Sequence, residues 1–265
     1  MEKSGVAIYR CGRCGVRFWT PENPEAIGGI YGEDYFKSDA SEIGYNDYFL
    51  LEKGLRKTFR KRLRRMKRAD PNIETCIEVG SGPGFFLHEA ATCGLKCRGV
   101  EISEYASGWG RENLGVLLDT GKVEDVDLPL HCFDAACMWD VIEHLPDPVA
   151  TLKHLRNLLK PNGRIWLSTG DSGSLAARIS GKRWHLYTIP EHLFFFDRKS
   201  IRETLKLAGF ETRAVFYETI YVPLAYVFER LAKTLNLRIP LIKNCAFLLP
   251  ITLFDVMTVY AQKSA

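Results

Sequence analysis

The sequence predicts an α/β fold in which helices cover both faces of a doubly wound, mostly parallel sheet. Short apolar runs alternate with amphipathic segments through most of the chain, as repeated βα units do. The runs carry small or apolar residues at successive positions, which is typical of strands buried on both faces. One run, 76–79, passes directly into Gly80, Gly82 and Gly84, a pattern that lets backbone approach a ligand closely. We therefore expect the ligand at the carboxyl ends of the strands.

Composition is that of a cytoplasmic protein. A chain of 265 residues can bury one large α/β core with a small appendage. It has no signal-peptide pattern, and charged residues interrupt its C-terminal apolar runs before they reach the length of a membrane span. The eight cysteines stand at irregular spacings, several of them inside apolar runs. This spacing predicts reduced thiols and not a disulfide framework.

Residues 1–50 are predicted to form an N-terminal arm. Its Cys11-Gly12-Arg13-Cys14-Gly15 segment looks like one knuckle of a zinc ribbon, which supplies half of the four ligands of a structural zinc site. The other cysteines lie in or beside predicted core elements, so the sequence disfavours zinc and predicts no metal site. The alternatives are a degenerate ribbon, or one whose first knuckle lies upstream of Met1. The Pro-, Gly- and Tyr-rich stretch 20–49 is predicted to be an aromatic lid over the crevice, or an arm packed on the core.

The next segment has the periodicity of an amphipathic helix. Its apolar residues recur every three to four positions, at Leu51, Leu55, Phe59, Leu63 and Met66. The rest of its surface is basic, because ten Lys and Arg and no acid fall within 53–68. This basic face is either simply solvated or a surface for an anionic substrate, a nucleic acid or a membrane.

Helices and strands alternate beyond the glycines. Helices are predicted at 85–91, 104–113 and 149–159, and strands at 96–100, 116–118, 133–138 and 164–168, with a turn at 160–163. The irregular stretch 170–198 is long enough to be a substrate loop. The segment 51–265 is thus one domain that contains this loop.

The C-terminal part adds two further strands and an apolar insertion. Ser200 and Glu203 form a capping box that opens a helix ending at Gly209, and strands are predicted at 211–217 and 255–262. Between these strands, the apolar insertion 218–254 reads as amphipathic helix and loop. It could roof a substrate pocket, touch a bilayer or a lipid-like substrate, or pack on the sheet.

Two acidic residues at strand ends indicate the kind of nucleotide. Glu78 precedes the first glycine by two residues; its carboxylate would repel a pyrophosphate but suits a ligand with ammonium and sulfonium charge. A dinucleotide fingerprint would need glycine where Phe85 stands. Glu101 follows the second strand, where an acid can accept both hydroxyls of a ribose.

These motifs, in this order, resemble those of the class I S-adenosylmethionine-dependent methyltransferases. IEVGSGPG at 77–84 resembles the first motif, GVEIS at 99–103 the second, and the segment from Phe133-Asp134 through WDVIEHLPDP at 139–148 the fourth-strand motif. PEHL at 190–193 and AGFE at 208–211 resemble a later signature of the branch that includes enzymes of quinone and modified-sugar biosynthesis. The resemblance covers about residues 31–263.

The resemblance implies a Rossmann-like, seven-stranded sheet whose last strand, 255–262, runs antiparallel beside 211–217. It implies S-adenosylmethionine as the cofactor and S-adenosylhomocysteine as its product. The implied cofactor-binding residues are Glu78 with the loop Gly80, Ser81, Gly82, Gly84 and Phe85 for the methionine end, Glu101 for the ribose, Ile102 for the adenine, and backbone near Met138 and Trp139 for the amino-acid group. Many members also place an aspartate after the third strand's glycine, whereas here Lys122 follows Gly121; Val123 or Glu124 is expected to substitute.

The reaction expected is in-line methyl transfer to a small-molecule acceptor, a hydroxyl or carbon of a quinone-, sugar- or lipid-like compound, without a metal. A hydroxyl acceptor needs a base, for which His192 is the first candidate, His144 the second and His185 the third. Glu191 is expected to orient or charge-tune the His192 ring. Two other functions remain open: an RNA-directed methyltransferase or RNA-binding protein using the basic helix, and a cofactor-binding protein without catalysis. Nucleic acid is disfavoured, because Phe59 is the only aromatic residue within 53–68.

Overall fold

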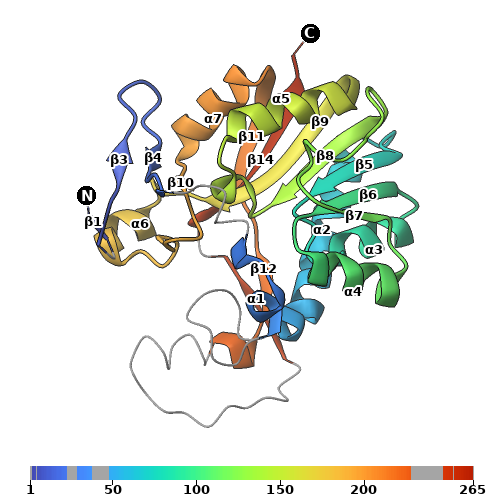
Figure 1. Cartoon of the computed structure of the whole chain (residues 1–265), viewed down its shortest axis with the longest axis horizontal. Helices are drawn as coiled ribbons and strands as arrows, with labels where there is room; N and C mark the ends of the chain where they lie inside the picture. Colours follow the sequence, from blue (N-terminus) through green and yellow to red (C-terminus); the bar gives the residue numbers. More distant parts are fainter. Residues whose placement is uncertain are drawn as a thin grey trace.

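A seven-stranded sheet forms the centre of the computed structural model, which describes residues 2–3, 5–22, 29–37, 48–227, 247–252 and 254–264. The strand order is β11-β14-β9-β8-β5-β6-β7 (Figure 1). Strand β14 pairs antiparallel with both of its neighbours, whereas the strands from β9 to β7 pair in parallel. The predicted doubly wound α/β sheet, with its last strand antiparallel beside 211–217, is confirmed.

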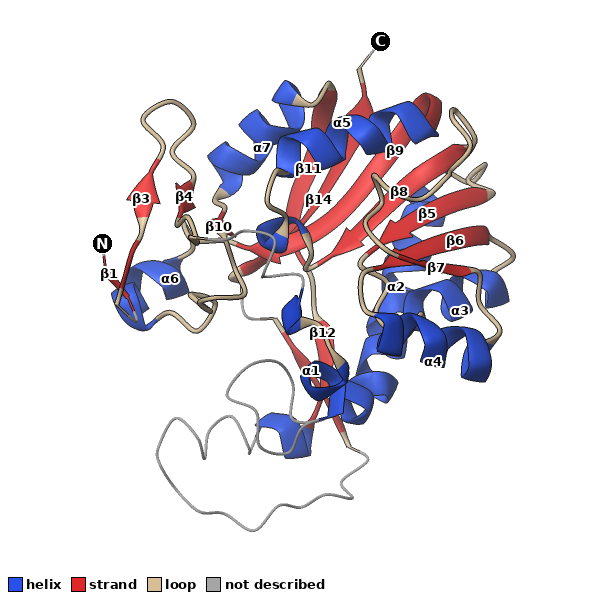
Figure 2. Cartoon of the chain, in the orientation of Figure 1, coloured by secondary structure: helices blue, strands red, loops and turns tan. Residues whose placement is uncertain are grey.

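Helices cover both faces of this sheet (Figure 2). The sheet strands are β5 (Thr75–Val79), β6 (Lys96–Glu101), β7 (Leu118–Thr120), β8 (Phe133–Trp139), β9 (Leu159–Gly170), β11 (Phe210–Tyr217) and β14 (Val256–Lys263). The helices on one face are α2 (Glu52–Ala69), α3 (Phe85–Thr92) and α4 (Glu104–Leu114), and those on the other are α5 (Pro148–Leu158) and α7 (Arg198–Leu207). Successive strand residues enter opposite cores: Ile77 packs in the cluster of α5 and α7, and Cys76 in that of α2 and α3.

Shorter elements surround the sheet. In the N-terminal arm they are β1 (Glu2–Lys3), β2 (Val6–Ala7), β3 (Tyr9–Arg10), β4 (Arg17–Phe18), α1 (Glu33–Lys37) and the 3₁₀ turn η2 (Tyr48–Leu51). Later in the chain they are η3 (Ile142–His144), α6 (Leu175–Ser180), η4 (Gly181–Arg183), β10 (Phe194–Phe195), β12 (Ile220–Pro223) and β13 (Leu248–Ile251). Strand β4 pairs with both β3 and β10, so the arm is joined to the predicted substrate loop.

Most predicted boundaries lie within one residue of the structure, and three elements differ by more. Helix α7 begins at Arg198, because Asp197 and Ser200 form its capping box in place of the predicted Ser200 and Glu203. Strand β7 begins at Leu118, two residues later than predicted, and the turn predicted at 160–163 lies inside β9. The pairing of β9 with β8 jumps from Phe133 opposite Leu159 to Ala135 opposite Arg164. The four turn residues are therefore accommodated as a bulge, which lets one strand continue on both sides of them.

The insertion 218–254 was predicted as amphipathic helix and loop, but its described ends contain two strands as well as helical residues at 224–227. Strands β12 and β13 pair antiparallel there, and β12 packs on α2. A Cβ atom at Gly54 would lie 2.2 Å from the carbonyl oxygen of Tyr221, so only glycine lets the helix approach the hairpin this closely. The Tyr221 amide also donates a 3.0 Å hydrogen bond to the Thr58 hydroxyl. The rest of the insertion, 228–246, lies outside the described residues.

The cysteine prediction is wrong at one pair. Cys76 on β5 and Cys97 on β6 stand opposite each other in the parallel pairing and are joined by a disulfide. Spacing along the chain gave no sign of the pair, because it is brought together only by the pairing of two strands. Among the described cysteines, Cys11, Cys14, Cys93, Cys132 and Cys137 are free thiols.

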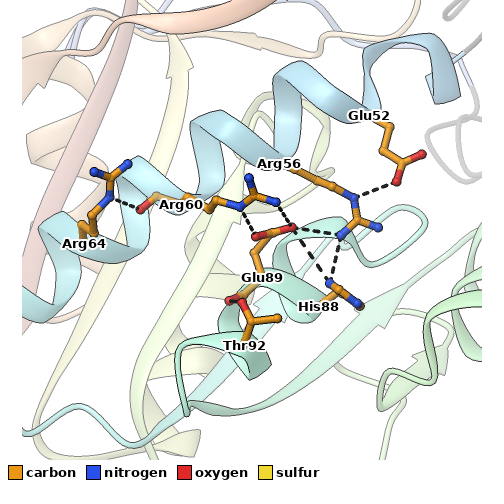
Figure 3. Close-up of polar contacts among 7 residues, drawn as sticks. All are labelled: Glu52, Arg56, Arg60, Arg64, His88, Glu89 and Thr92. Carbon is orange, nitrogen blue, oxygen red and sulfur yellow. Dashed lines mark hydrogen bonds and ion pairs between the residues drawn. The ribbon is translucent and has the colours of Figure 1, made fainter.

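The basic helix is α2, and much of its charge is used inside the molecule. Arg56 and Arg60 both bind the buried carboxylate of Glu89 on α3, at 3.0 and 2.5 Å (Figure 3). Burial alone would raise the pKa of Glu89, but the two guanidinium groups outweigh it and lower that pKa below its ordinary value. This part of the helix is therefore a packing surface for α3 and not a simply solvated face.

Arg62 lies on the buried side of the same helix. Its Nε atom is 3.1 Å from Oε2 of Glu218, and the two side chains are only 5% and 2% exposed. Its guanidinium also lies 4.3 Å from the ring centre of Trp139 at the end of β8. Arg65 reaches the second oxygen of Glu218 at 3.4 Å. The ion pair thus joins α2 to the sheet close to the glycine loop.

Replacing Arg62 with Met is expected to lower the free energy of unfolding by about 2 kcal/mol. The change leaves a buried carboxylate with its weaker partners Arg65 and the Thr258 hydroxyl, and loss of one member of a buried pair costs up to about 3–5 kcal/mol. Urea unfolding followed by circular dichroism measures the effect. Arg64→Met is the control, because Arg64 donates only to the Arg60 carbonyl at an exposed position. Equal stability of the two variants would contradict the role of the Arg62–Glu218 pair.

Candidate active site

The glycine loop lies where β5, β6 and β8 end. All three of its glycines have positive φ, at +70° for Gly80, +51° for Gly82 and +80° for Gly84. A Cβ atom at Gly80 would lie 2.4 Å from the Val141 side chain, and one at Gly84 would lie 2.8 Å from that of Val116. Glycine is therefore required both by the backbone conformation and by the close packing of the loop.

Two buried polar atoms face no partner at the ends of neighbouring strands. Oε2 of Glu78, a side chain 2% exposed on β5, accepts no hydrogen bond from the described residues. Nε1 of Trp139, at the end of β8, likewise has no acceptor among them. Burial raises the pKa of Glu78 well above its ordinary value. Met138 is fully buried in the core, so only its backbone can contribute to a site here.

Glu101 joins the end of β6 to the glycine loop. Its Oε2 accepts a 2.7 Å hydrogen bond from the Gly82 amide, and its Oε1 a 2.9 Å bond from the Ser103 amide. The side chain is buried, and this burial raises the pKa of Glu101. Beside it, Ile102 is 38% exposed and offers an apolar surface at the rim. Ser81 turns inward, and its hydroxyl donates to the Glu78 carbonyl.

Val123 and Glu124, the two residues expected to contact an adenine, reach different surroundings. Val123 is 2% exposed and packs in the core. Glu124 is exposed, and its carboxylate accepts a hydrogen bond from the Thr151 hydroxyl at the start of α5. Only the backbone of Val123 is accordingly left to face a ligand, whereas the Glu124 side chain is directed to α5.

Aromatic side chains of the arm lie on the glycine loop. The Tyr48 ring stacks on Phe85 with centroids 6.1 Å apart, and its hydroxyl would be 3.7 Å from a Cβ atom at Gly82. Phe36 of α1 contacts Tyr48 at 5.5 Å. Burial raises the pKa of the Tyr48 phenol. The lid itself stays a prediction, and its segments 23–28 and 38–47 lie outside the described residues.

Two of the three candidate histidines, His144 and His192, are in contact with each other. The rings of His144 and His192 are nearly perpendicular, with centroids 4.6 Å apart. Nδ1 of His192 is 2.9 Å from the Leu186 carbonyl oxygen, and Nδ1 of His144 is 2.9 Å from that of Glu191. A carbonyl only accepts, so Nδ1 of His192 carries the proton and its Nε2 keeps a lone pair. Nδ1 of His144 also lies 2.9 Å from the Tyr31 hydroxyl. The Leu186 carbonyl therefore orients His192.

His185 does not belong to this group. Its Nδ1 lies 3.6 Å from Oδ2 of Asp255, and its side chain is 52% exposed. The same Asp255 oxygen accepts a 2.9 Å hydrogen bond from Trp184 Nε1. The third candidate base thus lies in a separate polar cluster at the start of β14.

Glu143 is a functional candidate that the sequence reasoning missed. Its side chain is 3% exposed, and its Oε2 has no partner among the described residues. Burial, and then the charge of Asp140, raises its pKa to about 8. Ligand atoms of Glu143, His144 and His192 lie within 4.8 Å of one another, a spacing that could hold a metal ion, although the sequence predicted no metal site. The Glu-His dipeptide in the fourth-strand motif was the available signal.

Asp140 was also overlooked, although it stands in the same motif. It has φ of +57°, a conformation that is uncommon for residues other than glycine. The Ser168 hydroxyl accepts from its amide at 3.1 Å and donates to its carboxylate at 3.0 Å. This exchange of hydrogen bonds keeps an exposed carboxylate at the end of β8, where strained residues often serve a function.

Burial, and then the neighbouring His144, lowers the pKa of His192 to about 3. The ring is therefore neutral at every pH above about 4. In a proton NMR titration, we expect the His192 ring signal to keep its neutral position between pH 8 and 5, while free imidazole added as a reference titrates near pH 6.5–7. His192→Gln identifies the signal. A midpoint for His192 near that of the reference would contradict the buried environment.

A family model described as a methyltransferase domain matches residues 51–215. A ubiquinone biosynthesis O-methyltransferase of Thiobacillus denitrificans is 27% identical over 173 residues, which cover 60% of this chain and 73% of that protein. One of Xanthomonas axonopodis pv. citri is 30% identical over 108 residues, 38% of this chain and 45% of that protein.

Solved structures show the same fold. A SAM-dependent methyltransferase of Thermotoga maritima, described as a possible histamine N-methyltransferase, aligns with a TM-score of 0.55 at 21% identity, over 82% of this chain and 93% of that one. The magnesium protoporphyrin IX methyltransferase of Synechocystis, solved with bound SAH, aligns with a TM-score of 0.53 at 18% identity, over 89% and 92%. At these identities the likeness concerns the fold alone.

Proposed function

The chain belongs to the methyltransferase-domain family that matches more than half of it, and from this we propose that it methylates a small hydroxylated molecule with S-adenosylmethionine. That cofactor supplies an electrophilic methyl group on a sulfonium. The observation that carries the proposal is a pair of buried polar atoms, on Glu78 and Trp139, that have no hydrogen-bond partner among the described residues. A buried acceptor and a buried donor without partners are costly unless a ligand satisfies them.

Different residues of the chain would bind the methionine end and the ribose of S-adenosylmethionine. Oε2 of Glu78 would accept from the ammonium group, and Nε1 of Trp139 would donate to the carboxylate. A cation beside Glu78 would offset the burial that now raises the pKa of its carboxyl group. Glu101 keeps its two backbone hydrogen bonds and has lone pairs left for ribose hydroxyls. The exposed Ile102 supplies an apolar surface for the base.

We place proton removal from the acceptor in the group of Glu143, His144 and His192. His192 is neutral and keeps the lone pair on Nε2, so it can accept a hydrogen bond from a hydroxyl. A ring with a pKa near 3 holds a proton poorly, whereas Glu143 has a pKa of about 8, close to working pH. His192 would therefore position the hydroxyl, and the proton would come to rest on Glu143.

A small pocket with mostly apolar walls lies beside Glu143 and His192, and it has room for about one water molecule. It is lined by Glu143 and His192 together with Trp184, Leu186, Phe194 and Phe195. Its lining combines polar atoms of Glu143 and His192 with aromatic rings, so we propose that the pocket opens further for an acceptor that carries a hydroxyl on an apolar body. The relatives named as ubiquinone biosynthesis O-methyltransferases are consistent with such an acceptor.

Calorimetry of the purified chain with S-adenosylmethionine and S-adenosylhomocysteine tests the first half of the proposal. We expect both to bind in about the micromolar range. A mass-spectrometric screen of phenols, catechols and sugars for addition of one methyl group then tests turnover. No cofactor binding by a folded chain would refute the proposal. Cofactor binding without methyl transfer to any of the hydroxyl acceptors would favour the alternative function, a cofactor-binding protein that has no catalytic activity.

RNA is a weaker candidate substrate. Arg56 and Arg60 of the basic helix are bound to a carboxylate of the chain itself (Figure 3), and so is Arg62. We expect little binding of single-stranded RNA even at low salt. Fluorescence anisotropy over a salt series checks this, because phosphate recognition would give affinity that falls steeply with salt.

A further inference from the structure

The turn between β3 and β4 holds two thiols in unequal surroundings. The Cys11 amide donates to the Val16 carbonyl at 2.9 Å, and the Gly15 amide to the Cys11 carbonyl at 3.0 Å, which closes the turn. The sulfur of Cys11 lies beside the Cys14 thiol and the backbone of Arg13, Cys14 and Gly15, whose amides favour its thiolate form. Both cysteines are half-buried and can be reached by a small molecule.

This geometry makes Cys11 the more reactive thiol of the two. The amides, that of Cys14 first, lower its pKa to about 7, whereas burial raises the pKa of Cys14. About half of Cys11 is then thiolate at neutral pH, compared with a few per cent for an ordinary thiol. A thiolate beside a protonated thiol is the arrangement of an attacking and a resolving cysteine.

The two thiols do not form part of a larger metal site in the described chain. There, the group of three or more possible ligands close enough to share a metal is Glu143, His144 and His192, and it includes neither cysteine. Two thiolates supply half of a structural zinc site.

We propose that Cys11 and Cys14 form a dithiol site that exchanges with low-molecular-weight disulfides. The Cys11 thiolate attacks one sulfur of the small disulfide, which releases one thiolate and leaves a mixed disulfide on Cys11. Cys14 then gives up its proton to water, and its sulfur attacks that of Cys11, which releases the second thiolate. The small disulfide is reduced to two thiols, and the protein pair is oxidised to one intramolecular disulfide.

The dithiol turn is connected to the loop that carries His192. Strand β4 pairs with β10, with Phe18 opposite Phe194. The next residue, Trp19, donates its amide to the Leu193 carbonyl at 3.1 Å and its indole N–H to the His192 carbonyl at 2.7 Å. If His192 acts as proposed above, oxidation of the turn would change turnover through these contacts, and the thiol chemistry itself does not depend on that role.

Glutathione disulfide and the full chain test the exchange. After incubation and alkylation, peptide mass spectrometry is expected to find a Cys11–Cys14 disulfide in the wild type and a glutathione adduct on Cys11 in Cys14→Ser. Cys11 should also react with a thiol reagent at pH 7 about fivefold or more faster than the exposed Cys93, and Cys93→Ser should leave the disulfide unaffected.

Two results would overturn the proposal. One is a Cys11 that reacts no faster than Cys93 and gives no adduct in Cys14→Ser. The other is zinc bound in stoichiometric amount, measured on the unfolded chain with a metal indicator, together with thiols that react only after chelation. Both results are read from peptide masses and metal content. A failure of the proposed methyl transfer can therefore be distinguished from a failure of the proposed thiol exchange.

Discussion

Glu101→Ala is expected to weaken binding of S-adenosylmethionine on the order of a thousandfold. The carboxylate would lose its hydrogen bonds to the ribose, each charged bond being worth about 2 kcal/mol, and about 4 kcal/mol corresponds to that loss of affinity. It would also release the Gly82 and Ser103 amides that now bind its two oxygens. Calorimetry with wild type and variant measures the change directly.

Glu104→Ala is the matched control, because Glu104 is an exposed acid in the first turn of α4, three residues further on. Its affinity should equal that of the wild type. Thermal unfolding of Glu101→Ala without ligand shows whether the fold has survived. A folded Glu101→Ala that binds with wild-type affinity would remove Glu101 from the cofactor site.

Loss of His192 is expected to reduce turnover by about a hundredfold or more, with little change in cofactor affinity. The His192→Ala change removes the ring that would hold the acceptor hydroxyl next to Glu143, and a correctly placed acid–base group contributes about 10²–10⁴ to rate. Single-turnover methyl transfer at saturating cofactor isolates this step from binding and product release. His192→Gln can still donate to the Leu186 carbonyl and separates loop positioning from chemistry.

His185→Ala serves as the control on the same loop, since its ring is bound to Asp255 outside the pocket. It should keep most of the wild-type rate. Full activity of His192→Ala together with a large loss in His185→Ala would assign the chemistry to the other polar cluster. Comparable losses in both would indicate damage to the loop as a whole.

The sheet was predictable because its signals are local. Strand β5 leads into glycines that have positive φ, two of them without room for a side chain, and β5 and β8 are largely apolar runs. The positions of Glu78 and Glu101 follow for the same reason, since Glu78 is the penultimate residue of β5 and Glu101 is the last residue of β6. The position of a residue can be predicted from the sequence when it depends on a single helix or strand.

What the sequence did not reveal depends on contacts between distant segments. Glu143 gains its raised pKa from burial beneath the loop that carries His192. The Cys76–Cys97 bond needs the register of two strands, and the β12–β13 hairpin needs partners on either side of a long insertion. In each case the segment's own residues fit more than one outcome, and packing chooses between them.

The position of β14, inside the sheet and next to the edge strand β11, has a consequence for how the sheet is assembled during synthesis. This strand lies between β9 and β11, so β11 has no sheet neighbour until residues 256–263 are available. During synthesis those residues are added after all the other strands, and the half-built sheet exposes the edge of β9 until then. Pairing over long separations forms slowly and leaves such edges open to association. The last strand to be translated is thus the one that completes the sheet, and a chain that stops short of it should be prone to aggregate.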